Sequence, residues 1–302
     1  MKKHWIVGTR GSKLALIQTE IVIGELQVLY PSLSFETRII KTTGDSVWDT
    51  PLYLIGEKGL FIKEIEEALV RNDIDLAVHS MKDLPTDMLG GLSMSAILAR
   101  RDPRDTFVSL KYSRLSDVPL GARIGTSSMR RKTQLLAARP DLEIVPLRGN
   151  VDTRIGKLEA QGLDGIILAY AGVKRMGLED RVREMIPLDI MVPPSGQGAI
   201  GIETRADDAA AGLVRPLDDP PTRFEVGLER TFQTGVGGGC SVPLGVNARL
   251  AGHRVTLRVV FGAEDGTIIF KECAEGPEAE AEDLVRRLLE GLKRARQMGT
   301  HQ

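Results

Sequence analysis

The stretch DLAVHSMKDLP, residues 75–85, decides the fold that we expect for this chain. Its first half, residues 75–79, is a short apolar run typical of a buried strand. Its second half is polar and meets Pro85, which cannot continue the hydrogen bonding of a strand. We therefore expect a buried strand whose carboxyl end presents Lys82 and Asp83 at a turn.

Strand-like and helix-like segments alternate on both sides of this strand. A short apolar run at residues 4–7 ends at Gly8, and a helical pattern starts at Lys13, for which Ser12 is a good N-cap. The other predicted elements of this block are strands at residues 35–41 and 94–98 and a helix at residues 60–70. This alternation predicts a mostly parallel sheet with helices on both faces.

Shorter strand-like and helix-like segments alternate again after residues 100–104, RRDPR. The predicted elements are strands at residues 123–125, 143–146 and 165–169 and helices that begin at Met129, Val151 and Ala171. The chain then passes PPSGQG, residues 193–198, and a strand at residues 199–203, which together suit a crossover between domains. If that strand rejoins the first sheet, two strands link the first two domains as in a hinged clamshell.

After Pro220 and Pro221, the alternation of strand-like and helix-like segments gives way to several strand-like segments in succession. Predicted antiparallel strands lie at residues 246–250, 255–261 and 267–272, and an amphipathic helix carries Leu284, Val285, Leu288, Leu289 and Leu292. We therefore predict an α/β protein with a small α+β domain at its C-terminal end. The predicted domains are residues 1–98 plus 199–216, residues 99–198 and residues 217–302.

Length and composition indicate which classes of protein fit this chain and which do not. A chain of 302 residues with 42% hydrophobic and 27% charged residues is typical of a globular protein of two or three domains. Arg10 and Lys13 interrupt the first apolar run, and no window has the apolar length of a membrane helix, so we expect a cytoplasmic protein without a membrane partner. Two cysteines, four histidines and a net charge of −1 argue against a disulfide framework, a metal site and a nucleic-acid partner.

Several strand ends carry groups that bind anions. Residues 8–12, GTRGS, and residues 125–131, GTSSMRR, each combine the N–H groups of a helix start with hydroxyl and guanidinium groups. Residues 148–154, RGNVDTR, and the pair Lys174 and Arg175 add further cations in the second domain. Each cluster alone is also explained by helix capping with solvated arginines. Together they predict a cleft for a ligand with many negative charges, because the arginine fork pairs well with carboxylates.

Two residues are candidates for chemistry. Asp83, at a strand end, could stabilise a cation or move protons, although an ordinary turn aspartate is the alternative. Cys240 ends the glycine-rich run TGVGGGC, residues 234–240, which suits a covalent attachment point. We expect Cys273, in an alternating strand, and His79 to be packing residues.

Seven motifs in one order along nearly the whole chain resemble the hydroxymethylbilane synthase (porphobilinogen deaminase) family. They are GLF at 59–61, VHSMKDLP at 78–85, DPRD at 102–105, GTSS at 125–128, RGNV at 148–151, GQGA at 196–199 and GGC at 238–240. The resemblance implies three domains, two of them α/β domains like those of periplasmic binding proteins. Ser195, Gly235 and Ser241 depart from the family's usual pattern without removing a catalytic group.

The resemblance also implies a transferase of porphyrin and heme biosynthesis that acts as a monomer. Cys240 would carry a dipyrromethane cofactor, onto which four molecules of the substrate porphobilinogen add with loss of ammonia before water releases hydroxymethylbilane. Asp83 would assist loss of the amine and stabilise the cationic intermediate. The remaining implied cofactor contacts are Arg10, Ser12, Ser80, Lys82, Asp83 itself, Thr126, Ser127, Ser128, Arg130, Arg131, Arg148, Gly149, Arg154, Arg175 and Gln197. Residues 42–59 have no clear period, and a loop this long is typical of a lid or of a disordered segment; we favour a lid over the cleft.

A non-catalytic, two-lobed anion-binding protein is the main alternative, because a fold alone does not imply chemistry. Such a protein would need neither Cys240 nor Asp83. A phosphate- or nucleotide-handling enzyme is a second alternative, but residues 8–11 and 235–239 match none of the usual glycine-rich phosphate-binding motifs.

Overall fold

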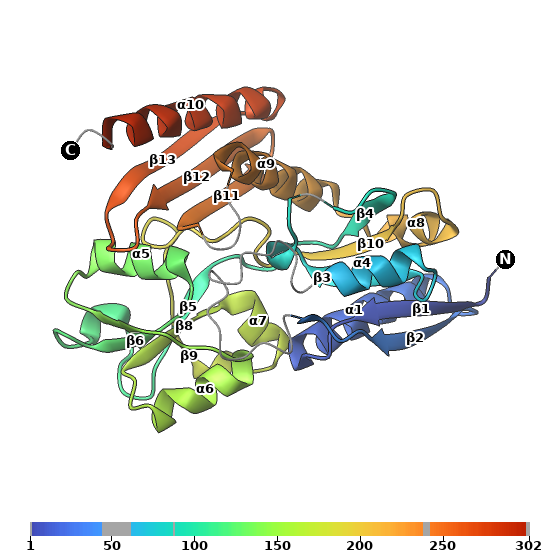
Figure 1. Cartoon of the computed structure of the whole chain (residues 1–302), viewed down its shortest axis with the longest axis horizontal. Helices are drawn as coiled ribbons and strands as arrows, with labels where there is room; N and C mark the ends of the chain where they lie inside the picture. The colour runs from blue at the N-terminus through green and yellow to red at the C-terminus, as the bar shows by residue number, and fades with distance from the viewer. Residues whose placement is uncertain (1, 44–61, 87, 238–241, 300–302) are drawn as a thin grey trace. The chain divides into compact units, whose positions relative to one another are not determined.

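The computed structural model describes residues 2–43, 62–86, 88–237 and 242–299 (Figure 1). The chain divides into two compact units, one made of Met1–Arg101 and Gly198–Arg223 and the other of Asp102–Gln197 and Phe224–Gln302. Within the described ranges, no helix is both long enough and apolar enough to span a membrane.

The first unit contains a five-stranded sheet in the order β2-β1-β3-β10-β4. Its strands are β1 (His4–Thr9), β2 (Ser34–Ile39), β3 (Leu76–Ser80), β4 (Leu92–Ile97) and β10 (Ile200–Arg205). Strand β1 runs parallel to β2 and β3, whereas β10 runs antiparallel to β3 and β4. The strand that we predicted at residues 199–203 therefore does rejoin the first sheet.

Helices cover both faces of this sheet. The helical segments are α1 (Lys13–Leu29), α4 (Lys63–Val70), η1 (Met81–Asp83), α8 (Ala209–Val214) and η4 (Arg215–Leu217). On β3, Leu76 and Val78 pack into a core with residues of α1, and Ala77 packs into a second core with residues of α4. The alternation of side chains along the strand thus buries both of its faces, as the apolar run in the sequence indicated.

The first sheet of the second unit repeats this arrangement in the order β7-β6-β8-β5-β9. Its strands are β5 (Asp105–Val108), β6 (Arg123–Gly125), β7 (Glu143–Val145), β8 (Gly165–Ala169) and β9 (Val182–Met185). Strand β6 is parallel to β7 and β8, and β5 is antiparallel to β8 and β9. The helical segments are η2 (Leu115–Asp117), α5 (Met129–Ala138), α6 (Val151–Ala160), α7 (Tyr170–Arg175) and η3 (Glu179–Arg181).

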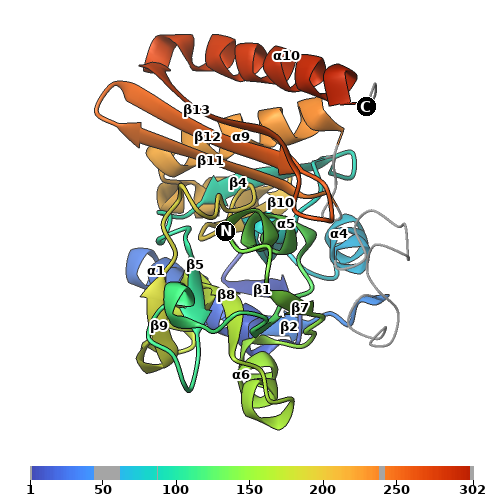
Figure 2. The same cartoon turned by 90° about the vertical axis from the view of Figure 1, so that its left-hand side faces the viewer.

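The second unit also contains a three-stranded antiparallel sheet. It consists of β11 (Leu244–Ala251), β12 (Arg254–Gly262) and β13 (Ile268–Pro277), with α9 (Pro220–Val236), η5 (Glu278–Glu280) and α10 (Ala281–Gly299) beside it in the chain. Figure 2 shows α10 lying along this sheet. Phe232 of α9, Leu257 of β12 and Leu288 of α10 belong to one buried cluster, so both helices share a core with the sheet.

These sheets confirm the predicted α/β class and the small antiparallel sheet with its final helix. The predicted boundary between residues 99–198 and residues 217–302 does not separate the two units. Both segments lie largely in the second unit, where each has a sheet of its own. The three-domain division stays a prediction.

Gly165 of β8 generates the first testable prediction. A Cβ atom at this position would collide with the ring of Phe107, which is fully buried. We expect Gly165→Ala to lower the free energy of unfolding by about 1–3 kcal/mol through overpacking, as measured by denaturant titration.

Gly156 of α6 is the matched control, because the Cβ that Gly156→Ala would add meets no atom within 4 Å apart from its chain neighbours and the backbone of its own helix. That substitution should stabilise the protein by about 0.5–1 kcal/mol, since alanine favours a helix interior over glycine. Equal effects of the two substitutions would contradict the packing at Gly165.

Candidate active site

Asp83 lies directly after the buried strand β3. The strand ends at Ser80 and continues into η1, where Met81 is buried and its N–H donates to the carbonyl of Ala199 at 3.1 Å. Asp83, the last residue of η1, is exposed. The buried methionine therefore fixes the turn, and the carboxylate stands at the carboxyl end of the strand as predicted.

The other predicted site residues of the first unit follow β1 and β3. These strands are neighbouring and parallel, so their carboxyl ends meet at one edge of the sheet. Ser12 caps α1 by accepting a hydrogen bond from the N–H of Ala15 at 3.3 Å. Ser80 and Gln18 exchange hydrogen bonds of 2.9 and 3.0 Å. Topology thus brings together Arg10, Ser12, Ser80, Lys82 and Asp83 at this edge.

His79 is a packing histidine, as the sequence indicated. It is buried, and its Nε2 lies 3.0 Å from a carboxylate oxygen of the fully buried Glu203. Glu66 of α4 is buried as well, and one of its oxygens accepts the N–H of Leu89 at 3.2 Å. These groups lie between α4 and the sheet and do not belong to the strand-end set.

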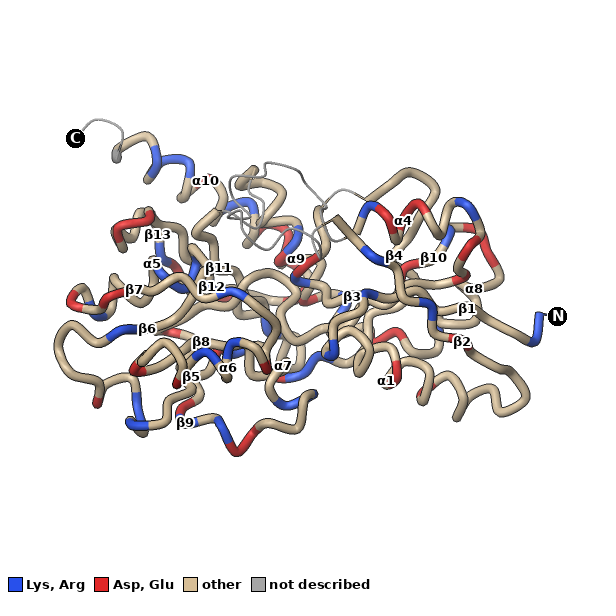
Figure 3. Tube along the Cα trace, turned by 60° about the horizontal axis from the view of Figure 1, so that its bottom comes forward, with Lys and Arg blue, Asp and Glu red and all other residues tan. Residues whose placement is uncertain are grey.

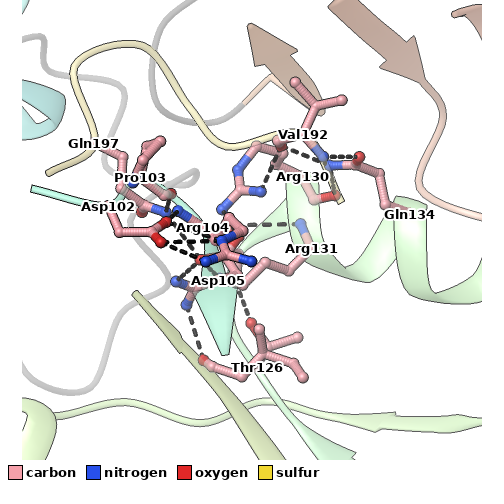
Figure 4. Close-up of polar contacts among 12 residues, drawn as sticks. Asp102, Pro103, Arg104, Asp105, Thr126, Arg130, Arg131, Gln134, Val192 and Gln197 are labelled. Carbon is pink, nitrogen blue, oxygen red and sulfur yellow. Dashed lines mark hydrogen bonds and ion pairs between the residues drawn. The ribbon is translucent and has the colours of Figure 1, made fainter. Parts of the chain in front are cut away.

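In the second unit, two of the predicted anion-binding arginines meet at one buried carboxylate (Figure 4). Asp105, the first residue of β5, is fully buried, and its oxygens lie 2.7 Å from Nη2 of Arg130 and 2.7 Å from Nη2 of Arg131. The side chains of these arginines are only 5% and 7% exposed. Although adjacent positions on a helix point about 100° apart, both long side chains reach the same acceptor.

This cluster carries an excess of positive charge, because two guanidinium groups face one carboxylate. Burial would raise the pKa of Asp105, but the charges and hydrogen bonds of Arg130 and Arg131 outweigh it and hold that pKa well below its usual range. Burial lowers the pKa of Arg130, and although Asp105 opposes this change, the charge of Arg131 adds to it. The surplus cation favours a further anion.

The hydroxyl groups of the loop before α5 bind backbone atoms. Ser128 caps the helix by accepting the N–H of Arg131 at 3.4 Å, and Thr126 accepts the N–H of Ser128 at 3.2 Å. Ser127 accepts the N–H of Leu147 at 2.9 Å. These contacts shape the loop, and direct binding of a ligand by these hydroxyls stays a prediction.

The remaining predicted residues follow β7 and β8. Arg148 and Gly149 follow β7, and Gly149 has a φ of +122°, where a Cβ would also lie 2.6 Å from Cγ2 of Thr153. Only glycine suits this turn. Arg154 lies in the first turn of α6 and Arg175 in the last turn of α7, and both are half-buried. Their roles toward a ligand stay predictions.

Gln197 is bound to the DPRD segment. It is 1% exposed, and its Nε2 donates to the carbonyl of Pro103 at 2.6 Å and to Asp105 at 3.1 Å. A contact of Gln197 with the cofactor stays a prediction. No role was predicted for Asp105, although the DPRD motif contains it. Its partners lie 25, 26 and 92 positions away in the chain, so only the fold reveals them.

Two predictions fall on residues without a described structure. Cys240 lies outside the described residues, and so do positions 44–59 of the predicted lid. Basic and acidic residues are both spread over the two units (Figure 3), in keeping with the net charge of −1. Within the described ranges, no group of three or more His, Cys, Asp or Glu side chains is placed to hold a metal ion.

Known families match nearly the whole chain. A family model described as "Porphobilinogen deaminase, dipyromethane cofactor binding domain" matches residues 5–212, and one described as "Porphobilinogen deaminase, C-terminal domain" matches residues 223–294. The chain belongs to the porphobilinogen deaminase family. The resemblance drawn from the seven motifs is thereby confirmed.

Individual relatives agree with this family. The porphobilinogen deaminase of Desulforudis audaxviator is 48% identical over 295 residues, which cover 96% of this chain and 96% of that protein. That of Carboxydothermus hydrogenoformans is 47% identical over 293 residues, covering 97% and 94%. Among solved structures, a nutrient binding protein from Burkholderia cenocepacia bound to methionine has a TM-score of 0.45 at 16% identity, covering 72% of this chain and 93% of that chain.

Glu66 generates a prediction about pH. Burial raises its pKa above the usual 4.5; the hydrogen bond from Leu89 opposes this rise and the nearby charge of Glu203 adds to it. The folded chain therefore keeps this proton to a higher pH than the unfolded chain, and the associated stability is lost as the pH rises through the folded pKa. We expect the stability of Glu66→Gln relative to wild type to increase as the pH rises above the usual pKa of 4.5, measured by thermal unfolding across a pH series.

Glu64, on the same helix, supplies a control because its pKa is shifted in the opposite direction. Burial raises its pKa, but hydrogen bonds to Thr43 and the backbone outweigh burial and lower it overall. Glu64→Gln should therefore lose stability relative to wild type above about pH 4.5, and this loss should vanish in acid. The same pH trend in both variants would contradict the assigned directions.

Proposed function

We propose that this chain is a hydroxymethylbilane synthase. It would join four porphobilinogen molecules, each with loss of ammonia, on a dipyrromethane cofactor and release the linear tetrapyrrole for porphyrin biosynthesis. The proposed enzyme is a cytoplasmic, monomeric transferase whose partner is this small-molecule substrate. Family membership supports this function, and nothing in the comparisons supports a non-catalytic anion-binding protein.

The observation that carries the proposal is the buried cluster of Arg130, Arg131 and Asp105. A pyrrole of this pathway bears an acetate and a propionate, so a cofactor of two rings is strongly anionic. The cluster offers a surplus positive charge in a buried place, which suits a carboxylate better than a neutral ligand. The residues present therefore fit the cofactor that the family model names.

The chain's own groups have separate tasks in this proposal. Cys240 would hold the cofactor covalently, and Arg130, Arg131 and the other cations at the strand ends would bind its carboxylates. When bound, the dipyrromethane supplies the pyrrole carbon to which the first substrate unit is joined. Asp83 would face the pyrrole nitrogens and stabilise the positive charge that develops as the amine leaves, because a carboxylate on a fixed turn needs no reorganisation.

Intact-mass measurement tests the attachment site. The purified protein should carry an added mass equal to two linked pyrroles, and Cys240→Ala should lack this mass and all turnover. Cys273→Ala is the matched control, because Cys273 is an exposed free thiol and that variant should keep both the mass and the activity. A fully active wild-type protein of unmodified mass would refute the proposed attachment.

Asp83→Ala tests the catalytic carboxylate. Because Asp83 is exposed, the variant should fold and keep the added mass, while kcat should fall by about 100-fold or more. Asp207→Ala, at an exposed aspartate of the same unit, should turn over porphobilinogen at the wild-type rate. Near-normal turnover of Asp83→Ala would assign the chemistry to another group.

A further inference from the structure

The DPRD motif, residues 102–105, opens the second unit and ends with Asp105. Nε of Arg104 lies 3.0 Å from Oδ1 and 3.1 Å from Oδ2 of Asp102, and Nη2 of Arg104 donates to Oδ2 at 2.6 Å. The carbonyl of Pro103 accepts Nε2 of Gln197. Asp105 then begins β5 inside the unit. The motif thus builds a turn that delivers one carboxylate to a buried place.

Asp105 accepts four hydrogen bonds from side chains of this cluster. Its Oδ1 accepts Nε of Arg131 at 3.2 Å, Nη2 of Arg131 at 2.7 Å and Nε2 of Gln197 at 3.1 Å, and its Oδ2 accepts Nη2 of Arg130 at 2.7 Å. The carboxylate is also fully buried. Asp105 is therefore enclosed by the groups that it holds, and an effect on a ligand would pass through them.

Each guanidinium group is fixed at a second point. Nη1 of Arg130 donates to the carbonyl of Val192 at 2.7 Å, and Nη1 of Arg131 donates to the carbonyl of Ile167 at 2.9 Å. A guanidinium group has five N–H donors, and the described contacts use two on Arg130 and three on Arg131. Both arginines are therefore held in place and still have donors for another acceptor.

We propose that Asp105 is a positioning residue for cofactor binding. It holds Arg130 and Arg131 as the shared counter-charge, and Gln197 holds Asp105, so the spare donors of both arginines are oriented before a cofactor carboxylate arrives. Gln197 thereby becomes a positioning residue rather than a cofactor contact. This inference rests on the proposed function and adds to it the groups that organise the anion site.

Asp105→Asn is the primary test, because it keeps the shape of the side chain and removes its charge. At a temperature where circular dichroism shows a folded protein, we expect the fraction of purified chains with the two-pyrrole mass to fall about tenfold or more. Asp141→Asn is the matched control, since it removes another Asp–Arg pair of the same unit, with Arg139, and should leave loading unchanged. Equal loading of Asp105→Asn and wild type would overturn the proposal.

A double-mutant cycle separates positioning from general destabilisation. If Asp105 acts through the arginines, Asp105→Asn should reduce loading by a smaller factor in the Arg131→Gln background than in wild type, because one of the two arginines that Asp105 holds is already gone. Defects that multiply, with the same fold loss in both backgrounds, would show that Asp105 acts independently of Arg131 and would overturn the proposal.

If Asp105→Asn does not fold, Gln197→Met tests the same proposal. It removes the Nε2 donor without changing a charge, and the proposal predicts that loading falls in the wild-type background and falls by a smaller factor in the Arg131→Gln background. The same fold loss in both backgrounds, or no loss in either, would overturn the proposal. A wild-type protein that carries no pyrrole mass would refute the proposed function itself, a result that the variants cannot mimic.

Discussion

The proposed anion site of the second unit depends on one constraint, that charges buried away from water must be paired. A lone guanidinium group would be costly inside the unit, and Asp105 offsets that cost for both Arg130 and Arg131. The same requirement joins the start of β5, the first turn of α5 and the segment that ends at Gln197. The ion pairs of Asp105 with Arg130 and Arg131 therefore connect three chain segments and also form the proposed binding site.

Topology explains why these groups gather at strand ends. In the first sheet β1 runs parallel to β2 and β3, and in the other five-stranded sheet β6 runs parallel to β7 and β8. The turns after β1 and β3, and after β6, β7 and β8, therefore open toward one edge of their own sheet. Asp83 follows the buried strand β3 of one sheet, and Arg148 follows the edge strand β7 of the other. Two copies of one arrangement thus present different groups, since the candidate acid lies only in the first unit.

The elements that depend on neighbouring residues could be predicted from the sequence, whereas contacts between residues far apart in the chain could not. The apolar runs that became β3 and β8 and the cap at Ser12 could be predicted because neighbouring residues determine them. Strand β5 was missed because it begins with a charged residue, and α9 was missed because two prolines were read as a break, although proline suits a first helical turn. The role of Asp105 could not be predicted, since its partners come from three separate segments.

The order of strands in the first sheet has a consequence for synthesis on the ribosome. Strand β10 lies between β3 and β4 but is encoded more than a hundred residues after them. Until Arg205 has left the exit tunnel, β3 can pair only with β1, and β4 cannot join the sheet because it lies at the edge beside β10. The strands of the other five-stranded sheet end at Met185 and are already outside the tunnel at that point. The sheet of the first unit is therefore expected to be completed later than the sheet that follows it in the chain.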